Sequence, residues 1–211
     1  MTTAFRTGAL VALSSVAGLA SAGTLNVTGM VPGKSRLIDL AIYGNARQLE
    51  AGPQAANYDG REFEGYCIDL SYTQQIPSTF SATPRAASGF LPEGDRIAKL
   101  VNQYAAGVTG RDQGAALQLA IWDILVDGGD GADAGDFRAS NLNTGTQGYF
   151  EGFLADPLIG VSNVATVYDP DSHGTNHNVN QGLIEAVPEP ASMIALGLGG
   201  LALLRRRKKS S

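Results

Sequence analysis

The sequence is poor in the residues that most often carry enzyme chemistry. Its 211 residues include one cysteine, Cys67, and two histidines, His173 and His177. A single cysteine excludes a disulfide within the chain, and it leaves a thiol that is buried and inert, reactive, or paired between chains. A Cys–His hydrolase would need a histidine and an orienting Asn or Asp beside Cys67, and no nucleophile motif surrounds this cysteine.

Positive charge is scarce between the two ends of the chain. Residues 23–187 contain 9 Lys and Arg against 19 Asp and Glu, which gives a formal net charge of −10. Such an acidic region argues against binding of nucleic acids or phosphates. We therefore expect no nucleic-acid partner, and no motif in the chain calls for a cofactor.

The N-terminus predicts export. Arg6 precedes an apolar run over residues 8–20, and Ala20-Ser21-Ala22 supplies the small residues of a cleavage site. This order is typical of a secretory signal peptide, here residues 1–22, although a single basic residue makes a weak start.

The C-terminus carries a second targeting pattern. Pro188-Glu189-Pro190 is followed by an apolar run over residues 191–204 and then by five consecutive basic residues. The run is shorter than the roughly 20 residues that span a bilayer as a helix, and the basic cluster should stay cytoplasmic. An ordinary tail anchor is the alternative interpretation.

This arrangement over residues 188–211 resembles the PEP-CTERM sorting signal of Gram-negative bacteria. The resemblance implies that an exosortase, a membrane protease, removes the segment as the protein passes to the cell surface or matrix. Membrane contact would then be limited to this transmembrane-like segment.

Residues 23–187 are long enough for one domain with its own core. Alternating and β-rich patterns predict strands over residues 24–31, 37–43, 63–72, 162–168 and 182–187. Helical spacing predicts helices over residues 95–106 and 112–126, the second with Asp112 as its N-cap. Residues 52–60 are expected to form a loop, and residues 74–94 a long connection with short extended pieces. Residues 137–154 mix helical and turn signals, with three expected core residues, Tyr149, Phe150 and Phe153. Strands at both ends and a helical middle predict an α+β domain, with a mixed sheet or sandwich.

Two separated stretches carry the most distinctive chemistry. Cys67 lies in Tyr66-Cys67-Ile68-Asp69, and Gln118 lies on the apolar helix four residues before Trp122, the only tryptophan. A thiol held beside an amide carbon can attack it, and loss of ammonia would leave an internal thioester. Trp122 shares a helix face with Gln118 and could keep such a bond dry, and Tyr66 could do so from the strand. Cys67 alone is more simply interpreted as a small buried hydrophobe.

Taken together, the two stretches resemble the thioester domains of bacterial surface adhesins. In those domains a cysteine after an aromatic residue is joined to the glutamine of an apolar-Gln-x-Ala-apolar-Trp motif, and the bond reacts with an amine or similar nucleophile on a partner. The resemblance covers about residues 60–126 and implies that Cys67 is the thiol, Gln118 the acyl donor and Trp122 the packing aromatic. Those adhesins are best known from Gram-positive bacteria and carry stalk repeats, which this chain lacks.

The hypothesis from the sequence is therefore an exported surface or matrix protein of a Gram-negative bacterium that attaches covalently to an extracellular nucleophile. Because the acyl transfer consumes the bond, we expect no catalytic residues and do not regard the protein as an enzyme. Tyr66, Trp122 and Asp69 are expected to support the bond, and Asp69 and Asp123 are candidates for proton transfer. The alternative is a non-covalent matrix or carbohydrate-binding protein with a structural cysteine.

The two histidines and an aspartate-rich segment partly resemble metal sites, but neither meets the requirements of one, and we expect no metal site. His173 and His177 have the spacing of a helical metal pair, but their Gly- and Asn-rich surroundings favour a solvated loop. Residues 127–136 place an aspartate at every third position, whereas a helix–loop–helix calcium site needs alternate carboxylates and a terminal Glu. We expect a flexible acidic loop there, with weak calcium binding at most.

Overall fold

The structure is a computed structural model that describes residues 21–70, 75–172 and 180–187. Within this part of the chain the first six strands are β1 (Gly23–Met30), β2 (Arg36–Ile42), β3 (Asn45–Ala51), β4 (Gln54–Tyr58), β5 (Arg61–Cys67) and β6 (Ser78–Ala86). The helical middle contains α1 (Gly94–Tyr104), a 3-10 turn η1 (Ala105–Gly107), α2 (Arg111–Asp127) and α3 (Thr144–Ala155), with β7 (Phe137–Ser140) between α2 and α3. The last two strands are β8 (Ala165–Pro170) and β9 (Leu183–Ala186).

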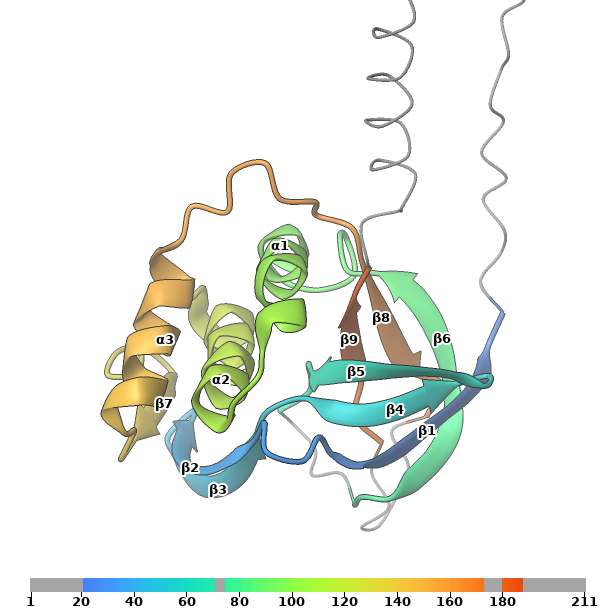
Figure 1. Cartoon of the computed structure of the whole chain (residues 1–211), viewed down its shortest axis with the longest axis horizontal. Coiled ribbons are helices and arrows are strands. Elements are labelled where there is room, and N and C mark those ends of the chain that lie inside the picture. The colour runs from blue at the N-terminus through green and yellow to red at the C-terminus, as the bar shows by residue number, and fades with distance from the viewer. Residues whose placement is uncertain (1–20, 71–74, 173–179, 188–211) are drawn as a thin grey trace, which may run out of the picture.

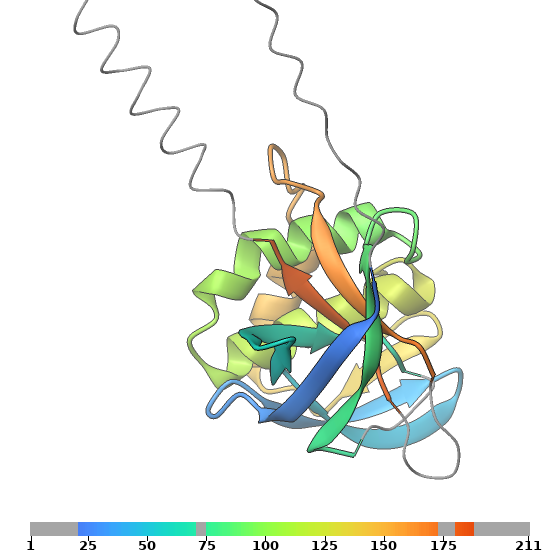
Figure 2. The ribbon, with the colours of Figure 1, turned by 90° about the vertical axis from the view of Figure 1, so that its right-hand side faces the viewer.

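Six strands close into an antiparallel barrel in the order β1-β4-β5-β9-β8-β6. Closure leaves these strands without a free edge. On β1 the buried residues Leu25 and Val27 alternate with more exposed neighbours, because successive side chains point to opposite faces of a strand. Figure 2 shows the barrel strands crossing one another on the side of the molecule opposite α3.

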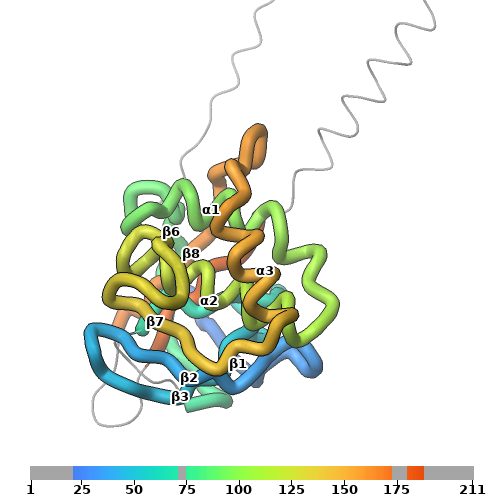
Figure 3. The backbone as a smooth tube through the Cα atoms, turned by 90° about the vertical axis from the view of Figure 1, so that its left-hand side faces the viewer, coloured from blue at the N-terminus to red at the C-terminus, as the bar shows by residue number. Residues whose placement is uncertain are grey.

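A separate three-stranded sheet, in the order β3-β2-β7, lies beside the barrel. Helix α2 packs against this sheet and against α1 and α3, and it lies between α3 and the barrel (Figure 1). Every residue of α2 from Gly114 to Ile124 is buried. A helix that is covered on all sides in this way is the centre of the domain rather than a surface element. Figure 3 shows the opposite side of the molecule, with α3 outermost.

The α+β class is confirmed, and a face-to-face sandwich is not, because the main sheet closes on itself. Both predicted helices are present as α1 and α2, and the predicted strands 24–31, 37–43 and 182–187 correspond to β1, β2 and β9. Strand β8 begins three residues later than predicted, and β5 ends at Cys67. Residues 71 and 72 of that predicted strand lie outside the described residues.

Several local predictions were wrong. Residues 52–60 are mostly strand β4 and the turn to β5, and β3 was not predicted at all. The connection 74–94 contains the nine-residue strand β6. Residue Gly110, not Asp112, is the N-cap of α2. Phe150 and Phe153 are buried as expected, but Tyr149 is 43% exposed.

The described residues contain no helix that is long and apolar enough to cross a membrane. The apolar run 191–204, for which a membrane role was predicted, lies outside them, as do residues 1–20 of the predicted signal peptide.

Candidate functional site

Cys67 lies in the buried end of strand β5. The first residues of β5 are exposed, whereas Gly65, Tyr66 and Cys67 are buried. Cys67 is the last residue of the strand, pairs with Leu183 of β9, and is 2% exposed. The lone cysteine is therefore placed where the barrel wall meets the helical layer.

Gln118 of α2 reaches this strand end directly. Its Oε1 atom accepts a hydrogen bond from the backbone N–H of Cys67 at 2.9 Å, and its Nε2 atom donates one to the backbone carbonyl of Cys67 at 2.8 Å. Gln118 is 0% exposed. A carboxamide so deeply buried must be bonded to avoid a large desolvation cost, and here the partner is Cys67 itself. The structure thus brings together the two residues that the sequence paired across 51 positions.

The thiol of Cys67 is held against the backbone of Asp69. Its Sγ atom donates to the Asp69 carbonyl at 3.1 Å and accepts from the Asp69 N–H at 3.4 Å. Burial raises the pKa of the Cys67 thiol to about 12, although the Asp69 N–H and the Trp122 indole favour the thiolate. At neutral pH the sulfur therefore carries its proton.

The predicted supporting residues occupy different positions. Trp122 is 3% exposed and lies in the same pocket as Cys67. Its buried indole N–H favours the thiolate form of Cys67 and has no other hydrogen-bond partner among the described residues. Tyr66 is also buried but does not line this pocket, because adjacent strand residues point to opposite faces. Asp69 contacts the thiol through its backbone.

A pocket of about 330 Å³ lies at the thiol. Its wall includes the buried residues Cys67 and Trp122 and the exposed residues Gln48 and Glu50 from β3, so it connects the surface with the sulfur. Gln54, at the start of β4, also lines it; this side chain is 6% exposed, and its Oε1 atom has no hydrogen-bond partner among the described residues. The pocket thus offers a free acceptor beside a buried thiol.

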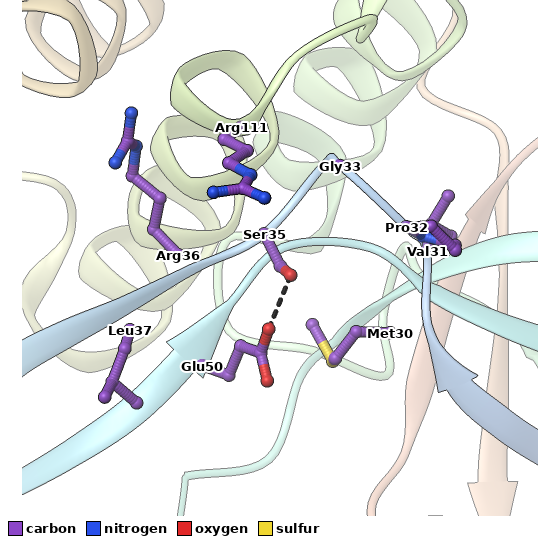
Figure 4. A pocket seen from close by; sticks show the side chains of 9 residues that line it. All are labelled: Met30, Val31, Pro32, Gly33, Ser35, Arg36, Leu37, Glu50 and Arg111. Atoms are coloured by element: carbon purple, nitrogen blue, oxygen red, sulfur yellow. Dashed lines mark hydrogen bonds between the residues drawn. The ribbon is translucent and has the colours of Figure 1, made fainter.

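A second hollow, of about 470 Å³, shares Met30 and Glu50 with the first (Figure 4). The hydroxyl of Ser35 donates to Glu50 at 2.6 Å in its centre, and Arg111 from the first turn of α2 lies beside it. Glu50 therefore stands between the two hollows, where a bound partner could contact both.

Other sequence candidates lie elsewhere. His173 and His177 lie outside the described residues, so the Cys–His and histidine-metal alternatives stay untested. Asp123 does not line the Cys67 pocket; its Oδ2 atom accepts a hydrogen bond from Gly131 in the loop after α2.

Sequence reasoning missed the β3 and β4 residues of the pocket, Gln48, Glu50 and Gln54. Residues 52–60 had been interpreted as a loop because they contain Pro53, Asn57 and Gly60. Asp59-Gly60 is in fact a two-residue hairpin turn joining β4 to β5, with positive φ at both residues. The Asp-Gly signal was present and would have indicated two paired strands.

Comparison with known protein families finds a sorting motif near the C-terminus. The model of the PEP-CTERM protein-sorting motif matches residues 186–208. This motif indicates an exported protein that is processed by an exosortase and sorted to the cell surface. Searches of the curated proteins and of the solved structures gave no match.

Proposed function

We propose that this exported protein forms an internal thioester between Cys67 and Gln118 and uses it to attach covalently to a partner outside the cell. The observation that carries the proposal is the pair of buried hydrogen bonds between the Gln118 carboxamide and the backbone of Cys67. They keep the amide group next to the residue that bears the only thiol, and proximity of this kind lowers the barrier to an intramolecular reaction.

Formation of the bond requires the thiol to leave Asp69 and attack the side-chain carbonyl carbon of Gln118. The new S–C bond replaces the C–N bond, and the thiol proton leaves with the amide nitrogen as ammonia. Because the thiol pKa is raised to about 12, a base must assist, and Glu50 is the carboxylate that lines the same pocket. The product is neutral, so its burial is less costly than that of a thiolate.

Attachment would follow when a nucleophile enters the pocket from the surface. An amine or hydroxyl would attack the thioester carbon, form an amide or ester with the former Gln118 side chain, and return its proton to the sulfur as Cys67 leaves. The Oε1 atom of Gln54, a residue that lines this pocket, has no hydrogen-bond partner among the described residues and would accept a hydrogen bond from the incoming N–H or O–H group. The buried Trp122 side chain lines the same pocket and would limit the contact of the bond with water.

The sorting motif supports a location at the cell surface, where such a bond would meet an extracellular partner. We further propose that the cell is a Gram-negative bacterium and that the partner is a matrix polymer, a neighbouring protein or another cell. Adhesion to that partner would be irreversible and would occur once per molecule.

A second function has its own support. The thiol is hydrogen-bonded and protonated, and the oxygen and nitrogen of the Gln118 carboxamide each form one hydrogen bond with the Cys67 backbone, as expected of a purely structural contact. The protein would then be a non-covalent matrix or carbohydrate-binding protein in which Gln118 fixes the end of β5.

The intact mass of the exported protein, before and after incubation with methylamine, separates the two functions. A thioester predicts a mass short by one ammonia, and methylamine then adds across the bond. Cys67→Ala and Gln118→Glu should each abolish both effects. Gln113→Glu is the matched control, because this residue lies on the same helix but bonds to Thr109. A wild-type mass equal to that of the processed sequence, with Cys67 alkylated only after unfolding, would reject the thioester and favour the structural role.

A further inference from the structure

Three carboxylates meet at the C-terminal end of α2, in a cluster that takes no part in the Cys67 site. Asp123 and Asp127 are one turn apart on the helix, and Asp130 follows in the loop that leads to β7, the yellow segment of Figure 3. One oxygen from each lies within 4.8 Å of the other two. The sequence spacing of the aspartates did not indicate this group, because it combines a helix face with a loop.

In each of the two helix carboxylates, one oxygen accepts a backbone hydrogen bond and the other does not. The Oδ2 atom of Asp123 accepts a hydrogen bond from Gly131 N–H at 3.1 Å, and the Oδ2 atom of Asp127 accepts one from Phe137 N–H at 2.8 Å. Both Oδ1 atoms are buried and receive no hydrogen bond from a donor group of the described residues, the two carboxyl groups lie within hydrogen-bond range of each other, and Asp123 as a whole is 0% exposed. An unpaired carboxylate oxygen in such a position is costly unless a ligand occupies it.

No nearby cation of the protein compensates this charge. None of the three aspartates forms an ion pair within the part of the chain that the structure describes. Arg96 is close, but it donates to the carbonyls of Gly128 at 2.6 Å and Leu154 at 3.3 Å. A cation bound between the three carboxylates would supply the positive charge that these side chains lack.

We propose that Asp123, Asp127 and Asp130 bind a calcium ion. Calcium is bound by oxygen ligands at 2.3–2.6 Å, so any two oxygens on one ion are at most about 4.6–5.2 Å apart, and the oxygens of this cluster, all within 4.8 Å of one another, are close enough to share one ion. Asp130 is exposed, which leaves room for water to complete the coordination. Sites of this kind in extracellular modules typically have Kd values of about 0.1–1 mM.

The loop is shaped closely around the carboxylates. A Cβ atom at Gly135 would lie 2.1 Å from Oδ2 of Asp127 and 2.8 Å from Oδ2 of Asp130, so the backbone there approaches both side chains directly. A bound ion would fasten this loop, and with it the start of β7, to the end of the central helix. Calcium outside the cell would thereby stabilise the helix that also carries Gln118.

Thermal unfolding and calorimetry of the exported protein test the site. After treatment with EDTA, addition of about 10 mM calcium chloride should raise Tm by at least about 3 °C, as expected for a Kd of about 1 mM in a domain of this size. Calorimetric titration should show one calcium ion bound per chain, and magnesium should give a smaller rise in Tm because it requires shorter, more regular coordination.

Asp130→Asn and Asp133→Asn provide a matched pair, because both residues are exposed in the same loop and only Asp130 belongs to the cluster. We expect Asp130→Asn to lose at least half of the calcium-dependent rise and Asp133→Asn to keep it. Equal responses in the two variants would mean general charge screening and would overturn the site. The absence of both calcium heat and a Tm change in the wild-type protein would also overturn it.

Discussion

The proposed Cys67–Gln118 thioester would have a large effect on stability, because it would close a long loop. The two residues are 51 positions apart, and a cross-link over a loop of that length lowers the entropy of the unfolded chain by about 4 kcal/mol at 25 °C. Without the bond, Cys67→Ala removes only a small buried group, and the two hydrogen bonds between the Gln118 carboxamide and the backbone of residue 67 remain. Its cost is then about 1 kcal/mol.

The two functions therefore predict different results in urea unfolding of the exported protein. With the thioester, Cys67→Ala should lower the free energy of unfolding by about 5 kcal/mol, and methylamine treatment of the wild-type protein should lower it by about 4 kcal/mol without any mutation. Methylamine should have no further effect on Cys67→Ala, which serves as the control for nonspecific action of the amine.

A loss of only about 1 kcal/mol in Cys67→Ala, together with no response of the wild type to methylamine, would refute the loop-closure reasoning. The role of Gln118 would then be limited to its two backbone hydrogen bonds.

Two other predictions concern the stability of helix α3 and of its contacts with the start of α2. Phe150→Ala should destabilise the protein by about 3–5 kcal/mol and Tyr149→Ala by less than about 1 kcal/mol in chemical unfolding, because their side chains are 1% and 43% exposed; equal losses would contradict the placement of α3. The Asp112 carboxylate accepts hydrogen bonds from Asn143, Thr146 and Arg36, and these bonds, with Asn143 the largest cause, lower its pKa. The ionised Asp112 carboxylate therefore stabilises the fold above the ordinary pKa of an aspartate, and this stabilisation is lost as the pH falls through the lowered pKa of the folded protein. The difference in Tm between wild type and Asp112→Asn should therefore shrink below about pH 4. A difference in Tm that stays constant with pH would count against this role.

The local elements that could be predicted are those whose pattern is strong within one segment. Helix α2 has a long apolar run that ends at Asp127-Gly128-Gly129, and α1 has helical spacing, so both appeared at nearly the right bounds. Strands β3 and β6 were missed because they carry many polar, Ala, Ser and Thr residues, and their strand state is decided by pairing with β2, β1 and β8.

The candidate site was predicted in part. Cys67 and Gln118 were paired from two motifs, and the structure places them in contact. The pocket at the thiol could not be predicted, because Gln54 and Glu50 reach it only through the β3–β4 region, which had been interpreted partly as a loop. Tyr66 was assigned to the bond from its position in the sequence alone, and the alternation of strand side chains takes it out of that pocket.

The sequence by itself determined the sorting motif, the single thiol, the acidic charge of the central region and the apolar character of α2, since each of these can be read from the chain without its fold. Tertiary structure decided which side chains share a buried environment. Closure of the barrel brings the end of β5 under α2, so that the Gln118 carboxamide finds its partners on Cys67. The same helix turns Asp123 toward the following loop, where it joins Asp127 and Asp130 in a cluster that the spacing of the loop aspartates alone does not include.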